Sequence, residues 1–166
     1  TYVEPDGDVV QLSIKGVGTG KLVPGEDGIL DLEISGTNAA SKVIAKIISA
    51  EGDGNLSLRN IDAISVLGSL QFGNVDVDGN LAFTAGVKNL ILDEVSGPSY
   101  LSIGLFTGKE SQKTKLTFGS VSDLSVQTLM SIQSITAREW LNTDGIADTI
   151  LTPNLSSLKI TGDRTG

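Results

Sequence analysis

A short apolar phrase, in which leucine or isoleucine is usually followed two residues later by another aliphatic residue or phenylalanine, returns along most of this chain. It occurs at Leu56, Ile64, Leu70, Leu81, Leu90, Leu101, Leu116, Leu124, Ile132 and Leu158. Most of these phrases alternate in the manner of a half-buried strand, and turn-forming residues separate them. Short strands that repeat in this way are typical of a β-solenoid, in which each coil of the chain stacks on the one before.

The separation between similar phrases suggests the length of one coil. GDGNLSLRN (residues 52–60) and VDGNLAFTAGVKN (residues 77–89) are offset by 25 residues, and Leu90 and Leu116 are offset by 26. The pairs Ile64 with Leu90 and Ile132 with Leu158 have the same offset of 26. We therefore predict an all-β chain folded as a right-handed parallel β-helix with three faces. The alternative is an antiparallel β-sandwich, which has no reason to repeat its wording at a fixed interval.

The N-terminal part, residues 1–52, has a different rhythm and is predicted to be a cap or the first coils. VVQLSIKG (residues 9–16) and ILDLEISG (residues 29–36) alternate like strands, forming a hairpin or a pair of solenoid edges. The stretch between them is rich in turn residues, and Val23-Pro24-Gly25 is predicted to form a type II turn. Residues 38–52 fit both a capped amphipathic helix and a strand, and the sequence pattern leaves both open.

Residues 53–166 are predicted to form the coils of the helix, continuous with the N-terminal region and interrupted by two insertions. The first insertion is the polar stretch at residues 107–115, read as a loop that protrudes from one corner. The second, at residues 135–154, carries the only tryptophan, Trp140, which we expect to pack as an anchor beneath the loop. Insertions of this kind form loops or a cap, and specific functions tend to reside on them.

Composition excludes several classes of function. The chain has no cysteine and no histidine, which removes disulfides, zinc thiolate sites and the commonest general base. A net charge of −8 repels phosphate backbones, so nucleic acid is not expected as a partner, whereas cations such as calcium are. No segment is apolar for the roughly 20 residues that a membrane-spanning helix needs. The chain starts at Thr1 and stops soon after a strand-like phrase, so we expect it to be part of a longer protein.

Two acidic clusters are candidate calcium sites, although no cofactor is required by the sequence. Glu4, Asp6 and Asp8 lie at alternate positions, where their carboxylates could converge on a cation, with Glu26, Asp27 and Asp31 as further partners across the hairpin. Asn142, Asp144 and Asp148 match three ligand positions of a calcium loop, with Gly145 at the tight turn, but Trp140 and Leu151 occupy two other ligand positions. Ordinary turn chemistry explains both clusters equally well.

No catalytic residues are predicted, and the chain is not expected to be an enzyme. A carbohydrate-active β-helix enzyme would need acidic side chains beside Arg or Lys along one face. The central candidates are Asp76, Asp78 and Asp93, with Arg59 the nearest guanidinium. Alternation points Asp76 and Asp78 outward, where solvation explains them.

Several long stretches resemble a domain found in very large secreted or surface-attached repeat proteins of planctomycete-type bacteria. They are PDGDVVQLSIKGVGTGKL, LEISGTNAASKVIAKI, SLQFGNVDVDGNL and, most specifically, ITAREWLNTDGIADTILTPNLSSLKITGD. Such domains are mostly uncharacterised or likened to autotransporter passengers and adhesins. The resemblance implies an extracellular or cell-surface location and a strand at residues 38–52, and it supplies no catalytic residues. We therefore expect a non-catalytic structural or adhesive module. Its expected partners are adjacent repeats of the same longer chain and a surface glycan or protein; the alternative function is a polysaccharide lyase or hydrolase.

Overall fold

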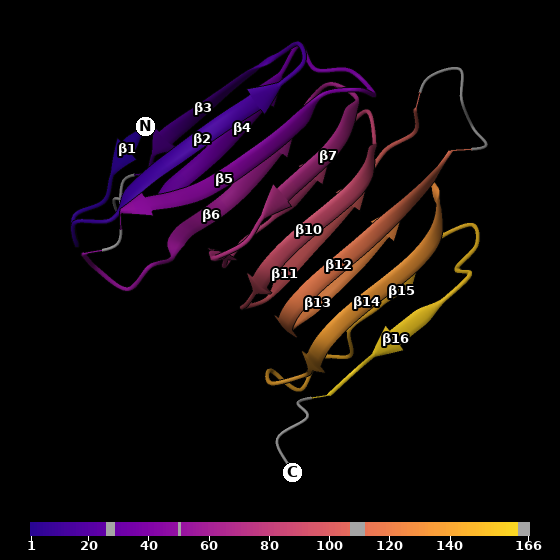
Figure 1. The fold of residues 1–166 in the computed structure, drawn as a ribbon. Helices are drawn as coiled ribbons and strands as arrows, with labels where there is room; N and C mark the ends of the chain where they lie inside the picture. The colour runs from indigo at the N-terminus through magenta and orange to yellow at the C-terminus, as the bar shows by residue number, and fades with distance from the viewer. Residues whose placement is uncertain (26–28, 50, 107–111, 163–166) are drawn as a thin grey trace.

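The protein is a β-solenoid of about five turns, in which successive coils are joined by parallel strand pairs. The computed structural model describes residues 1–25, 29–49, 51–106 and 112–162, and this part of the chain contains no helix. Figure 1 shows the coils following one another along a single axis, from the indigo N-terminal strands to the yellow C-terminal ones. The predicted parallel β-helix is confirmed and the antiparallel sandwich is wrong, because only the N-terminal strands pair in antiparallel fashion. Its handedness stays a prediction.

Three parallel ladders run along the solenoid, one on each face. The first contains β5 (Lys42–Ser49), β7 (Leu67–Phe72), β10 (Val87–Val95), β12 (Lys113–Ser122), β14 (Ser131–Leu141) and β16 (Leu158–Ile160). The second contains β4 (Leu30–Ser35), β6 (Leu56–Ala63), β9 (Leu81–Phe83), β11 (Ser99–Ile103), β13 (Leu124–Thr128) and β15 (Ile150–Leu151). The third is built around the short β8 (Val75–Val77), which pairs with the start of β6 and the end of β10. The C-terminal halves of β12 and β14 continue this third face.

The N-terminal end is covered by antiparallel strands. The chain runs through β1 (Tyr2–Val3), β2 (Val9–Lys15) and β3 (Thr19–Pro24) before it enters the parallel ladders. β2 lies between β1 and β5, and β3 pairs with β4, so the hairpin joins β3 to β4 and not residues 9–16 to residues 29–36. The predicted turn at Val23-Pro24-Gly25 is also wrong, because Val23 and Pro24 pair with Asp31 and Leu30 within the hairpin.

The ambiguous stretch at residues 38–52 contains a strand. β5 pairs with β2 on one side and with β7 on the other, and Val43 and Ala45 are buried in the core. The helical spacing of its aliphatic residues is overridden because a strand here supplies hydrogen bonds to two neighbours at once. The implication of the family resemblance holds at this point, whereas local helical spacing is misleading.

The coils are shorter and less uniform than predicted. The paired inward residues Leu70, Leu90, Leu116, Ile135 and Leu158 are separated by 20, 26, 19 and 23 residues. The offset of 26 from Leu90 to Leu116 is therefore right, but Leu81 pairs with Ile61 and not with Leu56. Ile64 lies outside the strands with 66% of its surface exposed. A basic coil of about 20 residues lengthened by loops had been taken for a coil of 25 or 26.

The two predicted insertions are narrower than expected where the structure describes them. Residues 107–111 lie outside the described part of the chain, and residues 113–115 belong to β12. Residues 135–141 belong to β14, so the second insertion reduces to the non-strand stretch at residues 142–149 and the turn after β15. Alternation in a strand and polarity in a loop look alike at such boundaries.

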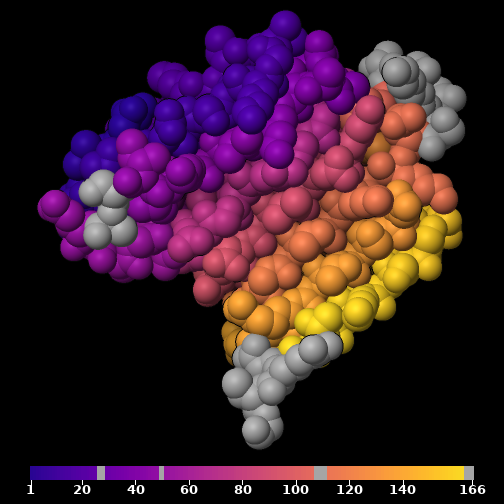
Figure 2. Space-filling view, in the orientation of Figure 1, coloured from indigo at the N-terminus to yellow at the C-terminus, as the bar shows by residue number. Residues whose placement is uncertain are grey.

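The core is a set of columns of apolar side chains that run along the solenoid axis. Inward residues of neighbouring coils pair directly, as Leu70, Leu90 and Leu116 do, and all three have no exposed surface. The colours of Figure 2 follow one another in bands across the molecule, because each coil contacts mainly the coils before and after it. Stability therefore depends on how closely neighbouring coils approach.

We expect Gly104→Ala to destabilise the protein and Gly73→Ala to leave it nearly unchanged. A Cβ at Gly104 would lie 1.9 Å from the backbone oxygen of Thr84 in the preceding coil, whereas a Cβ at Gly73 would meet no atom within 4 Å. Forcing the coils apart should lower the free energy of unfolding by about 1–3 kcal/mol, as overpacking does elsewhere. Urea denaturation of the two variants measures the difference, and equal midpoints would contradict the stacking described.

Candidate functional site

Three carboxylates converge in the turn between β1 and β2. One carboxylate oxygen from each of Glu4, Asp6 and Asp8 lies within 4.8 Å of the others. The turn is closed by two backbone hydrogen bonds: Glu4 N–H donates to Asp8 O at 2.9 Å, and Gly7 N–H donates to Glu4 O at 3.1 Å. Gly7 adopts a φ of 103°, which favours glycine. The turn therefore brings alternate side chains together, as the sequence pattern suggested.

Asp8 anchors this cluster to the loop that follows β5. Its side chain is completely buried, and its two oxygens accept hydrogen bonds from the backbone N–H groups of Gly52 at 2.8 Å and Gly54 at 2.7 Å. Asp6 contributes a weaker contact, accepting from Asp53 N–H at 3.4 Å. A buried carboxylate needs such donors to offset its desolvation. The cluster is thus a fixed joint between two distant segments of the chain.

Glu4 is the least satisfied member of the cluster. Its Oε2 atom is buried and has no hydrogen-bond partner. Burial raises the pKa of Glu4 to about 7, and the negative charges of Asp6, Asp8 and Asp53 raise it further, against a lowering contribution from a hydrogen bond with the Ser57 backbone. Carboxylate oxygens are the ligands that calcium prefers, and a cation here would relieve the repulsion between the acids. The donor set therefore fits a hard divalent cation.

The further partners predicted for this cluster do not all bear on it. Glu26 and Asp27 lie outside the described residues. Asp31 instead forms an ion pair with Arg59 at 2.7 Å, and hydrogen bonding to that guanidinium lowers the pKa of Asp31. Asp53 is the acidic neighbour that the sequence did not reveal, because it joins the cluster only through the packing of the loop after β5.

The second cluster is engaged in its own loop. Asn142 Oδ1 accepts from Gly145 N–H at 2.9 Å, and Asp144 Oδ1 accepts from Ile146 N–H at 2.7 Å. Asp148 Oδ2 accepts from Trp140 Nε1–H at 2.9 Å. These are the contacts of a compact turn, with Gly145 at a φ of 78°. Each of the three predicted ligands therefore already serves a donor of the same stretch of chain.

Asp123 is a residue that sequence reasoning missed. It is 7% exposed, and its carboxylate accepts hydrogen bonds from Thr143 N–H at 2.5 Å, from the Thr143 hydroxyl and from Asp144 N–H at 3.2 Å. Hydrogen bonding from Thr143 lowers the pKa of Asp123. Asp123 holds the loop at residues 142–149 against the preceding coil, a contact between residues about 20 apart that no local motif signals.

Trp140 packs as expected. It is half-buried against the core, and its ring meets that of Phe118 edge to face with 6.1 Å between centroids. Its indole N–H is used by Asp148, so the loop and the ring fix each other. Trp140 is thereby an anchor for the loop.

The central acidic residues do not form an acid and base pair with Arg59. Val75 and Val77 are completely buried, so alternation points Asp76 and Asp78 outward as predicted. Burial raises the pKa of Asp76 to about 6, and the charges of Glu94, Asp93 and Asp53 add to the rise. Asp76 and Glu94 are register partners on adjacent strands, which explains their repulsion. The Arg59 guanidinium binds Asp31 on the neighbouring face.

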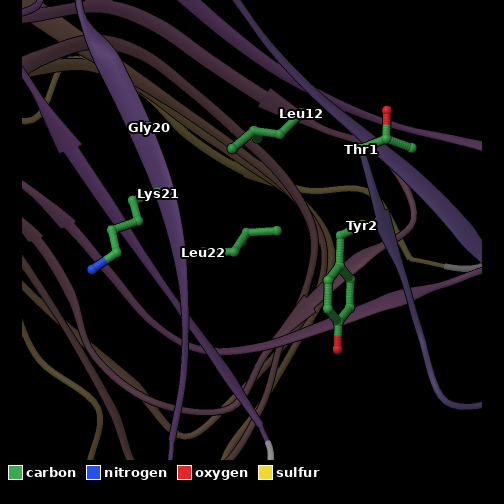
Figure 3. A pocket seen from close by; sticks show the side chains of 6 residues that line it. All are labelled: Thr1, Tyr2, Leu12, Gly20, Lys21 and Leu22. Atoms are coloured by element: carbon green, nitrogen blue, oxygen red, sulfur yellow. The ribbon is translucent and has the colours of Figure 1, made fainter.

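Shallow pockets on the described part of the chain do not combine acidic with basic side chains. Two are lined by carboxylates, one by Glu33 and Asp62 and another by Asp123, Asp144 and Asp148. The pocket at the N-terminal end has a volume of about 410 Å³ and is lined by Thr1, Tyr2, Leu12, Gly20, Lys21 and Leu22. Figure 3 shows the Lys21 ammonium pointing away from the apolar side chains of this pocket. None of these surfaces has the arrangement of a hydrolase.

The sequence matches no protein-family model, no curated protein and no solved structure. Among the described residues, no helix is long and apolar enough to cross a membrane. The functional argument for this chain therefore rests on its geometry.

Proposed function

We propose that this chain is a non-catalytic structural or adhesive module of a large extracellular or cell-surface protein. The observation that carries the proposal is the uninterrupted apolar core, whose columns join all the coils into one rod. A rod of stacked coils holds its loops at fixed spacings, which suits a spacer or a display scaffold. Its partners are adjacent repeats of the same longer chain and a surface glycan or protein. The resemblance to surface repeat domains of planctomycete-type bacteria supports the same location.

A second candidate function is that of a carbohydrate-active enzyme. It is favoured by one observation, the register pair of Asp76 and Glu94, in which one carboxylate has a pKa raised to about 6. Two carboxylates with separated pKa values are the usual equipment of glycoside hydrolysis. Against it stand the lack of a described pocket around this pair and the engagement of Arg59 elsewhere.

We also propose that the cluster of Glu4, Asp6 and Asp8 binds calcium. The convergence of three carboxylates and the buried, unpartnered Glu4 Oε2 support this. A cation would tighten the joint between the turn after β1 and the loop after β5, since Asp8 already binds that loop. Asn142, Asp144 and Asp148 form the weaker candidate, because their side chains are already occupied.

A glycan and polysaccharide array, run beside a degradation assay, tests the two functions. We expect no new reducing ends or unsaturated products from any polysaccharide, because no described acidic group faces a basic partner in a groove. Retention of a glycan on the array would identify the adhesive ligand. Depolymerisation that is abolished in Asp76→Asn and retained in the exposed Asp78→Asn would instead establish the enzyme.

Thermal melting with calcium and with EDTA tests the metal proposal. Calcium should raise the melting temperature, since a ligand that binds only the folded state stabilises it. The shift should be larger near pH 8 than near pH 6, because Glu4, with a pKa of about 7, must lose its proton to bind the ion. Glu4→Gln should remove the shift and Asp144→Asn should retain it. Identical melting curves in calcium and EDTA would eliminate calcium from both clusters.

A further inference from the structure

The C-terminal end of the solenoid exposes the continuation of its core. Leu158 extends the inward column of Leu90, Leu116 and Ile135, which have no exposed surface, yet 51% of Leu158 is exposed. Ile160 extends the neighbouring column through Phe118 and Ala137, and 45% of it is exposed. The same inward positions that are covered in every preceding coil are thus uncovered in the last one.

The strands at this end also lack a neighbour on one side. Among the described residues, β16 pairs only with β14, and β15 pairs only with β13. An unpaired edge with apolar side chains is one that soluble proteins usually cover or protect with charges. Lys159 is the one charged residue of β16, and it follows the outward column of Thr117 and Thr136. The edge is therefore competent to accept another strand.

The N-terminal end is built differently. There β2 reverses direction against β5, and β1 reverses again against β2, so the parallel ladder stops. Val10 is completely buried, and Leu12, Ile14 and Leu22 pack against the core from this layer. Figure 1 shows the reversed strands gathered at one end and β16 alone at the other. One end is closed by the chain itself and the other is open.

A pocket marks the open end. It has a volume of about 200 Å³ and is lined by Trp140, Asp148, Ile150, Leu158 and Ile160. Ile150 belongs to the inward column of Val126 on the second ladder, so residues from two faces border the same hollow. Side chains of one further coil would occupy this position, as those of each coil fill the space beneath the next.

We propose that the C-terminal end is a docking surface for a further parallel β-coil. Its first strand would pair with β16 in register and place aliphatic side chains over Leu158 and Ile160. The proposal rests on the proposed function, because it specifies how an adjacent repeat joins this module. Its warrant is continuity: the surface is the interface that already joins β10 to β12 and β12 to β14, interrupted after β16.

Extending the chain by one coil tests this. Residues 162–166 are replaced by a copy of residues 139–161, which keeps the 23-residue offset between Ile135 and Leu158 for the next strand. We expect a higher melting temperature and amide exchange at Leu158 to Ile160 slowed about tenfold or more, as for strands that gain a partner. A matched extension with serine at the two inward aliphatic positions of the added strand should lose both effects. Serine at its outward lysine position should keep them.

Two results would overturn the proposal. One is a folded extended protein in which the amides of β16 exchange as fast as in the original chain. The other is a stable dimer of the original chain that Ile160→Lys converts to a monomer, which would assign the surface to a second copy. Failure here leaves the polysaccharide assay unaffected, and an enzymatic result there leaves the stability of the extended chain unaffected, so the two proposals fail separately.

Discussion

The structure depends on direct stacking of inward apolar side chains between successive coils. A short coil buries little by itself, and its strands gain a core only when the next coil places aliphatic residues over them. The buried columns through Leu70, Leu90 and Leu116 and through Phe118 and Ala137 are the physical expression of this requirement. Parallel pairing follows, because a coil that returns to the same face always arrives in the same direction.

Close stacking restricts which residues can form the corners and demands closure at the ends. Gly104 lies against the backbone of Thr84, leaving no room for a side chain between two coils. At the N-terminal end, reversed strands and the Asp8 joint close the core. At the C-terminal end nothing in the described chain does so, and this asymmetry gives the module a direction along which it can be extended.

The acidic composition is distributed so that several carboxylates face one another. Glu4, Asp62 and Asp76 each have a pKa raised by burial and by neighbouring acids. Such repulsion is tolerable when a cation or a proton is bound. This is why the acidic turn at Glu4 is a better candidate for a metal than the loop after β14, where backbone donors already satisfy the acids.

The sequence was sufficient for the strands and insufficient for the coil lengths. Alternation identified the inward residues of most strands, but equal wording at Leu56 and Leu81 suggested a pairing that the structure replaces with Ile61 and Leu81. Loops of variable size hide a basic coil of about 20 residues, since an offset of 26 can mean one lengthened coil. The convergence of the acidic turn was visible in its spacing. The roles of Asp53 and Asp123 were not, because each acts on a segment distant in sequence.

Because the chain contains no cysteine, introduced cysteine pairs can measure this register directly. Thr117 and Thr136 are outward register partners separated by 19 residues, whereas Thr117 and Thr143 have the 26-residue spacing of a uniform coil. Cysteines at Thr117 and Thr136 should oxidise rapidly to an intramolecular disulfide, since adjacent parallel strands bring their Cα atoms within the range that a disulfide spans. Cysteines at Thr117 and Thr143 should not. Rapid oxidation of the second pair with none in the first would contradict the stacked coils on which the account rests.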